Sequence, residues 1–259
     1  MPYRRLPNSL PSVLRALTKA RDNYKNTLLP ADRAISTAQF ALVDDTVADS
    51  LLNRLIKEAT DVDLAEAAQT PLTTAVSQTA ARLTMFASHF HQVLDLGITR
   101  GTFASGARSY YGRDVGAGSI PDLSDYDAVA DAAGKIVTGE AARATAEGAA
   151  HVPMALPTAA DVAALRTTFL TQRNQQQQAI VKTDREREEV QPVYAEAQAA
   201  AVDFADTVEY FYRKDKDDSS RRQKCERWGI VYVFATNEPG APPTGGGTGG
   251  GTGAPPATT

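Results

Sequence analysis

The hydrophobic residues of the first sixty positions follow helical spacing in two segments. In the first segment they recur at steps of 4, 3, 4 and 4, on one helix face: Val13, Leu17, Ala20, Tyr24 and Leu28. Ser9 and Pro11 suit the start of this helix, and Pro30 ends it. A second amphipathic helix is predicted to end near Thr60, from the positions Phe40, Val43, Val47, Leu51 and Leu55.

A third helix carries the most regular pattern in the chain, which we call the first seam. Its positions alternate steps of 4 and 3 over seven intervals: Leu72, Val76, Thr79, Leu83, Phe86, Phe90, Val93 and Gly97. Such alternation is typical of helices that pack lengthwise at a shallow angle. Gly97 and Gly101 end the helix, and a turn-rich stretch follows with one short helix predicted around 104–111.

Three more helices are predicted beyond this stretch, and the last of them is short and capped by Ser220 with Gln223. Ser124 and Asp127 form a capping pair that opens an alanine-rich helix through Val137. Thr158 and Asp161 open the longest segment, which reaches about Lys214. Its second half repeats the alternating steps of 4 and 3, which make a heptad. We call these positions the second seam: Val190, Tyr194, Ala197, Ala201, Phe204, Val208 and Phe211.

Pro192 lies inside the longest segment and removes one backbone donor. The segment is therefore either one long kinked helix or two helices that meet near 184–192. The helix-forming composition around the proline favours the long kinked helix. We expect the first and second seams to pack against each other in an antiparallel arrangement.

The segment GIVYVFA, residues 229–235, is the clearest strand signal, because it is β-branched and aromatic. Its partner is either the N-terminal PYRRL or another copy of the chain. From 239 to 259 the chain holds 13 Gly or Pro among 21 residues and no charge, which is typical of a disordered tail. We therefore predict an all-α protein: an elongated bundle of four to six helices over 1–238 with coiled-coil-like seams, one short C-terminal strand and a disordered tail over 239–259.

The charge balance narrows the possible partners. A formal charge of −4 and a pI near 5.5 argue against broad binding to nucleic-acid backbones, which needs a basic surface. The basic start is interrupted by Pro7 and Pro11 and has no apolar core, so it is unlike a secretory signal. Apolar runs fall far short of the roughly 20 residues that span a bilayer. We expect a cytoplasmic protein.

The histidines and the single cysteine are the candidates for metal binding or catalysis. His89 and His91 lie about 200° apart around a helix, so they cannot share one metal ion, and we expect His89 half-buried and His91 solvated. Cys225 has basic neighbours but no local base, so a small buried residue is expected there. The sequence predicts no catalytic residue, no cofactor and no metal site.

Several stretches together resemble a known family. MPYRRLPNS, LRAL, SHFHQVLDLGITRG, SYYG and KCERWGIVYVF are similar in order and spacing to a family of uncharacterised all-helical bacterial proteins. The resemblance covers roughly 1–236, and the Gly/Pro/Thr tail looks like an addition to it. It implies a helical fold and a bacterial origin, and it implies no activity.

The function predicted from these patterns is that of a non-enzymatic structural or interaction protein. We expect it to self-associate through its long helices and C-terminal strand. Its partner is therefore another copy of the chain, or alternatively another protein. The strand residues concerned are Ile230, Val231, Tyr232, Val233 and Phe234. The alternative is a module that binds a peptide, glycan or nucleic acid through the turn region, by Arg108, Tyr110, Tyr111 and Arg113.

Overall fold

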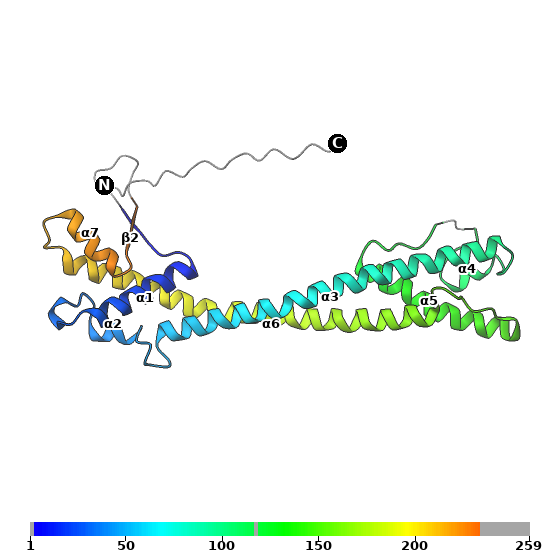
Figure 1. Ribbon diagram of the computed structural model, residues 1–259, viewed down its shortest axis with the longest axis horizontal. Coiled ribbons are helices and arrows are strands. Elements are labelled where there is room, and N and C mark those ends of the chain that lie inside the picture. Colours follow the sequence, from blue (N-terminus) through cyan, green and yellow to red (C-terminus); the bar gives the residue numbers. More distant parts are fainter. Residues whose placement is uncertain (1–2, 117–118, 234–259) are drawn as a thin grey trace, which may run out of the picture. The chain divides into compact units, whose positions relative to one another are not determined.

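The computed structural model describes residues 3–116 and 119–233, which form an all-α structure with one small β-ribbon (Figure 1). This confirms the predicted fold class. The helices of these residues are α1 (Leu10–Asn26), α2 (Thr37–Ala41), α3 (Leu51–Thr99), α4 (Ala107–Tyr110), α5 (Tyr126–Glu147), α6 (Ala159–Tyr212) and α7 (Asp218–Arg227). The strands are β1 (Tyr3–Arg5) and β2 (Val231–Val233), and short 3-10 turns lie at Pro30–Asp32 and Gly148–Ala150. The predicted tail, 239–259, lies outside the described residues.

The chain divides into two compact units within the predicted helical region. Unit 1 contains the residues up to Ala59 and those from Glu189 onward, and unit 2 is Thr60–Glu188. The long helices α3 and α6 each contribute residues to both units. Each unit has its own buried core, and the two are described in turn.

The second predicted helix is wrong in its position. Between residues 33 and 50 only α2 is helical, and residues 42–50 form turns in which the Asp44 carboxylate accepts hydrogen bonds from the Thr46 N–H and hydroxyl (3.0 and 2.8 Å). Such local bonds compete with a helix. α3 then begins at Leu51 and runs through Pro71 without ending near Thr60. Pro71 is exposed, so water can reach the carbonyl that its missing N–H leaves free.

The two seams have the predicted period but not the predicted partner. The first seam lies in unit 2 and the second in unit 1, and each packs on neighbours inside its own unit. The expectation that they pack on each other is therefore wrong, because heptad spacing identifies a buried stripe without identifying what covers it. In the second seam, Val190, Ala197, Ala201, Phe204 and Val208 are buried, whereas Phe211 is 40% exposed.

Unit 1 is built on the apolar face of α1. The four residues that α1 buries are the predicted ones, Val13, Leu17, Ala20 and Tyr24, and Ser9 caps the helix as expected. Gly229, in the turn before β2, has φ +95°, and a Cβ there would lie 2.8 Å from the Ala16 carbonyl oxygen. α1 and this turn therefore approach closely because residue 229 has no side chain.

The C-terminal strand pairs with the N-terminus of the same chain. β1 and β2 are antiparallel, with Arg4 opposite Tyr232. Both side chains then bind α6, since Arg4 donates to Asp206 and Glu209, and the Tyr232 hydroxyl donates to Glu209 (2.7 Å). Of the two alternatives for the strand's partner, the N-terminal segment is the one confirmed.

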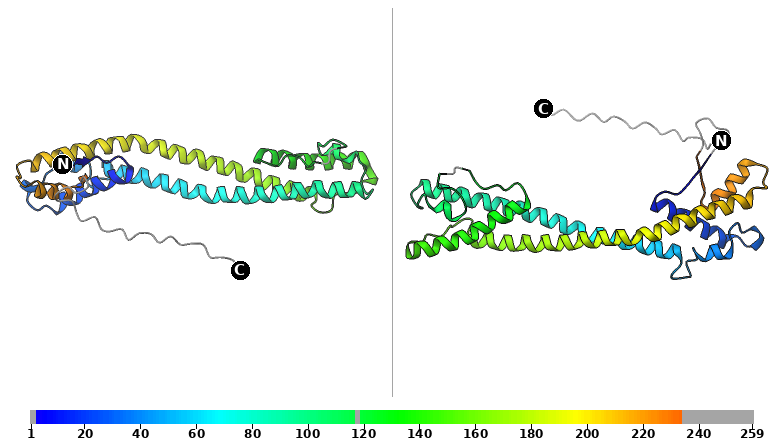
Figure 2. Two further views of the ribbon diagram at one scale, coloured as in Figure 1. Left: turned by 90° about the horizontal axis from the view of Figure 1, so that it is seen from above. Right: turned by 180° about the vertical axis from the view of Figure 1, so that it is seen from behind.

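Unit 2 is built from α3, α4, α5 and the first half of α6 (Figure 2). On α3 the buried positions again alternate steps of 4 and 3: Val76, Ala80, Leu83, Ala87, Phe90 and Leu94. α5 and α6 cover them with residues such as Ala133, Ile136 and Phe169. α6 is continuous through Pro192, as predicted.

The helix starts in the sequence were located to within a few residues. Thr158 and Asp161 exchange the predicted capping hydrogen bonds (3.1 and 3.0 Å). α5 is capped by Asp125, one residue after the predicted Ser124, and α7 by Asp217 rather than Ser220. In both cases an aspartate carboxylate accepts the free N–H groups of the first turn, which a neighbouring serine was expected to do.

Gly139 fixes the distance between α5 and the end of α4. A Cβ at this position would lie 2.7 Å from Cδ1 of Tyr111 and closer still to the Tyr110 carbonyl oxygen. We expect Gly139→Ala to lower the free energy of unfolding by about 1–3 kcal/mol through overpacking. Urea denaturation followed by circular dichroism measures this.

Gly134→Ala, on the same helix, is the matched control. Its Cβ would meet only the flexible Arg166 side chain, at 3.3 Å, and alanine favours a helix by roughly 1 kcal/mol over glycine. This variant should be as stable as the parent or more stable. Equal stability of both variants would contradict the close approach at Gly139.

Candidate functional site

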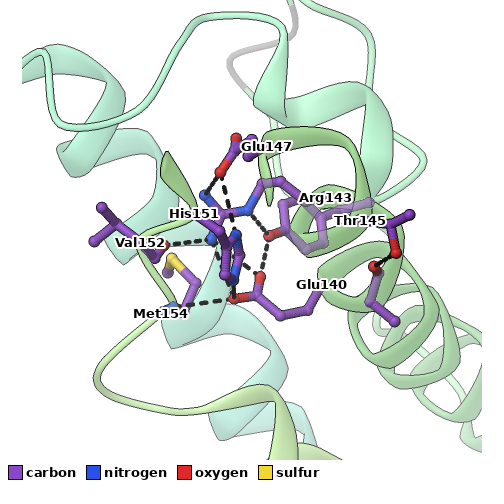
Figure 3. A network of polar contacts seen from close by, with 9 residues as sticks. Glu140, Arg143, Thr145, Glu147, His151, Val152 and Met154 are labelled. Atoms are coloured by element: carbon purple, nitrogen blue, oxygen red, sulfur yellow. Dashed lines mark hydrogen bonds and ion pairs between the residues drawn. The ribbon is translucent and has the colours of Figure 1, made fainter. Parts of the chain in front are cut away.

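The densest group of charged side chains in unit 2 lies where α5 meets the segment that leads to α6 (Figure 3). We call it the Glu140 cluster: Tyr111, Glu140, Arg143, Glu147 and His151. α5 supplies three of its members, at spacings of three and four residues that place them on one helix face. Tyr111 comes from the end of α4, and His151 follows the turn after α5.

Arg143 is the centre of the cluster and is fully buried. Its guanidinium donates to the Tyr111 hydroxyl (2.8 Å), to Glu140 (3.1 Å) and to the Val152 carbonyl (2.7 Å). It also donates to Glu147 (3.3 Å). The Phe103 ring lies under the guanidinium, 4.8 Å from centroid to Cζ. A buried arginine needs this number of acceptors, because its charge is costly away from water.

Glu140 receives hydrogen bonds from three directions. The Tyr111 hydroxyl and the Met154 N–H (3.1 Å) donate to it in addition to Arg143. His151 bridges the two carboxylates, with Nε2 3.4 Å from Glu140 and Nδ1 3.1 Å from Glu147. The cluster thus joins α4, α5 and the 151–154 segment.

The proton affinities in the cluster follow from these contacts. Burial alone would raise the pKa of Glu140, but hydrogen bonds from Tyr111, Met154 and Arg143 outweigh it and hold that pKa below its ordinary value. Burial and the adjacent carboxylate raise the pKa of the Tyr111 hydroxyl. Glu140 is therefore ionised and Tyr111 protonated at neutral pH.

This arrangement favours a structural role over a chemical one. A general base needs a free lone pair within reach of a substrate, and the Glu140 oxygens already accept from Tyr111, Arg143 and the Met154 N–H. Among the described residues, no group of three or more His, Cys, Asp or Glu side chains is placed to hold a metal ion. The cluster acts as a clamp on three segments of unit 2.

Two of the predicted interaction residues form a second ion network. Arg113 binds Asp95 through both terminal nitrogens (3.1 and 2.9 Å), and Arg108 binds the same carboxylate (2.7 Å). Burial tends to raise the pKa of Asp95, yet the two guanidinium groups lower it overall. Asp95 lies on α3, so both arginines hold the turn region against that helix.

The predicted tyrosine pair is divided between the interior and the surface. Tyr111 is fully buried in the Glu140 cluster, whereas Tyr110 is 37% exposed. A ligand at 108–114 would meet Tyr110 but not the hydroxyl of Tyr111. The burial of Tyr111 and Arg113 therefore does not favour direct ligand contact by these two side chains, and the predicted binding module would depend on Tyr110.

The predicted strand residues lie in unit 1. Ile230 is buried, and the next three are half-buried: Val231, Tyr232 and Val233. Phe234 lies outside the described residues. The strand residues are thus anchored within the chain through β1 and Glu209, and their role in self-association stays a prediction.

The expected environments of the two histidines are reversed. His89 is exposed, whereas His91 is fully buried. His91 comes directly after the buried Phe90, and the edges of the two rings are in contact, with centroids 5.9 Å apart. Both ring nitrogens of His91 are buried and have no hydrogen-bond partner among the described residues. Burial, with Arg113 nearby, lowers the pKa of His91 to about 4.

Cys225 is fully buried on α7, as expected. Burial raises the pKa of its thiol above the ordinary value, and this outweighs the hydrogen bond with Tyr232. Thiolate is the reactive form of cysteine, so this environment does not activate Cys225 as a nucleophile.

The sequence patterns do not predict the Glu140 cluster. One signal was present, because Arg143 follows Ile136 by seven residues and so occupies the buried face of α5. A charged residue at such a position requires buried partners. The partners themselves are separated along the chain by turns, and no spacing rule connects Tyr111 to Arg143.

Removal of the buried guanidinium tests the structural role of the cluster. We expect Arg143→Met to lower the free energy of unfolding by about 3–5 kcal/mol, because Glu140 is left buried without its cation. Urea denaturation at neutral pH measures the change. Arg173→Met, which removes an exposed pair with Asp127, is the control and should cost less than about 1 kcal/mol. An Arg143→Met variant as stable as the parent would contradict the clamp.

His91 should make stability depend on pH. Its pKa is about 4 when folded and about 6.5 when unfolded, so the unfolded chain binds more protons between these values. The free energy of unfolding therefore falls as the pH decreases through this range, by about 2 kcal/mol between about pH 7 and about pH 5. Urea denaturation at both pH values should find this loss reduced in His91→Leu and retained in His89→Gln. Equal pH dependence in the parent and His91→Leu would contradict it.

Comparisons with known proteins add no functional assignment. No family model, curated protein or solved structure matches the chain. Among the described residues, no helix combines the length and the apolar character needed to cross a membrane. The resemblance to helical bacterial proteins stays a prediction, and the function is argued from the residues themselves.

Proposed function

We propose that the chain is a non-enzymatic interaction protein that self-associates through helices of unit 2. The contact surface is the part of unit 2 where α3 and α6 form a pair that α5 reaches only at one end, through the Arg173–Asp127 ion pair. We call residues 60–75 of α3 and 172–188 of α6 the two-helix stretch. Figure 2 draws this pair side by side, and hydrogen bonds from Arg187 to Glu66 (2.8 Å) and from Gln176 to Thr73 (3.1 Å) join it.

The observation that carries the proposal is how little this stretch buries. Its only buried residues are Ala65, Thr183 and Glu186, of which only Ala65 is apolar. The Gln172 side-chain oxygen is buried without a hydrogen-bond partner among the described residues. Two paired helices cover only a narrow stripe of each other, so a stretch with a polar stripe gains little from folding alone.

Apolar side chains lie on the outside of the same stretch. Leu64 is 63% exposed and Val181 is 60% exposed. A second pair of helices that covered both positions would bury them in a four-helix arrangement, the usual solution for amphipathic helical hairpins. A symmetric contact between two copies achieves this with one surface.

Charge supports a second copy as the partner. In the two-helix stretch α3 carries Asp61, Asp63 and Glu66 and no basic residue. α6 has the basic residues Lys182, Arg185 and Arg187 there, against three acidic ones, and its Arg173 already pairs with Asp127 of α5. In an antiparallel contact, the acidic α3 of one copy would lie against the basic residues of α6 in the other copy. The strand gives weaker support, because β2 already pairs with β1.

Disruption of the two-helix stretch tests the proposal. We expect the full chain to be a dimer by size exclusion with light scattering, and Leu64→Glu/Val181→Glu to be a monomer at the same concentration. The two carboxylates would have to be buried in the contact without partners. Since both sites are exposed, helicity and unfolding midpoint should change little.

Leu28→Glu/Leu29→Glu is the matched control. These leucines of unit 1 are also strongly exposed, so the variant has the same change in charge and hydrophobicity. It should remain dimeric. A parent chain that is monomeric at all concentrations, or equal assembly of the parent and the unit 2 variant, would overturn the proposal.

A further inference from the structure

Unit 1 contains a cavity of about 430 Å³ that the proposed self-association does not use. It lies between the segment before α1, the first turns of α1, α6 and the turn that enters β2. We call it the arginine pocket. Its volume falls within the roughly 300–1,000 Å³ of small-molecule sites.

The inner wall of the arginine pocket is apolar. Phe204 of α6 is buried there, together with Trp228 and Ile230 from the turn after α7. Ala201 and Ala205 form the α6 side of this wall, and their small side chains leave room in the pocket. Such a wall favours a ligand with an apolar body. Each Å² of apolar surface removed from water contributes about 25 cal/mol of favourable free energy.

The rim of the pocket is basic. Arg4, Arg5 and Arg15 line it, and no Asp or Glu is among the described residues that do. Arg4 is neutralised by Asp206 and Glu209. Arg5 and Arg15 are exposed and have no ion pair within the described part of the chain.

The positions of these two arginines are determined by the fold. Arg5 is in β1, where it pairs with Val231 across the ribbon, and Arg15 is on α1. Ser12 also lines the rim, near the start of α1. The guanidinium groups therefore belong to two separate elements that border one apolar hollow.

We propose that the arginine pocket binds a small amphipathic carboxylate, with its apolar body against Phe204 and Trp228 and its head group at Arg5 and Arg15. A carboxylate accepts two parallel hydrogen bonds from one guanidinium and leaves lone pairs for another. The apolar wall excludes a simple inorganic anion as the preferred ligand, because such an ion would leave that wall unfilled.

Trp228 provides a direct readout, because it is the single tryptophan of the chain and lines the pocket. The full chain is titrated with decanoate below its micelle concentration, and tryptophan fluorescence is followed. We expect a saturable change, at least tenfold weaker binding of decanol, and no change with inorganic phosphate. Equal binding of decanol, or a response to phosphate alone, would overturn the carboxylate assignment, as would tighter binding of decyl phosphate.

Substitution of the exposed arginines locates the head group. Arg5→Gln/Arg15→Gln should weaken decanoate binding at least tenfold, with an unchanged unfolding midpoint because both side chains are exposed. Lys19→Gln/Arg100→Gln removes the same charge at exposed positions outside the pocket and should bind as the parent does. Equal weakening in both variants would mean that only net charge matters, and no saturable change in the parent would overturn the proposal altogether.

Discussion

Two paired helices can bury only a narrow stripe of each other, and the packing of both units follows from how that stripe is covered. In unit 1, α1 contributes Val13, Leu17 and Ala20 to the core, and the stripe of α6 contributes Ala197, Ala201 and Phe204. In unit 2, α5 covers the stripe of α3 from Val76 to Leu94 and leaves the two-helix stretch with a polar one. The covered parts are stable cores, and the uncovered part is where we propose a second copy binds.

The same constraint explains the position of the buried charges. α5 covers α3 through small residues, so Gly139 and the alanines of its inner face bring α4 and α3 close to its backbone. Near its C-terminal end that face carries Arg143 instead of an apolar residue. The guanidinium then takes acceptors from α4, from α5 and from the 151–154 segment. Charge thus joins these segments next to the apolar contacts of Tyr111 and Met154 in the core.

Helical periodicity predicted most of the fold because each core stripe has the 4 and 3 spacing in the sequence. It predicted α1 with its four buried residues and the continuity of α6 through Pro192. It misplaced the helix before α3, because Val43 and Val47 have helical spacing although the Asp44 side chain bonds locally and forms a turn. It also reversed the burial of His89 and His91, since α3 is covered on two sides at that level rather than one.

The sites were harder to predict than the helices, because a site depends on which elements meet. Arg108, Arg113 and Arg143 look like surface charges in the sequence, yet each has acidic partners in the folded chain. Arg5 and Arg15 have the same chemistry and no such partner among the described residues, so their positive charge remains available at the pocket rim. The two groups of arginines differ in whether the fold places an acidic side chain within ion-pair distance of the guanidinium. An arginine left unpaired beside an apolar hollow is a better indication of a binding site than the same residue type in a sequence motif.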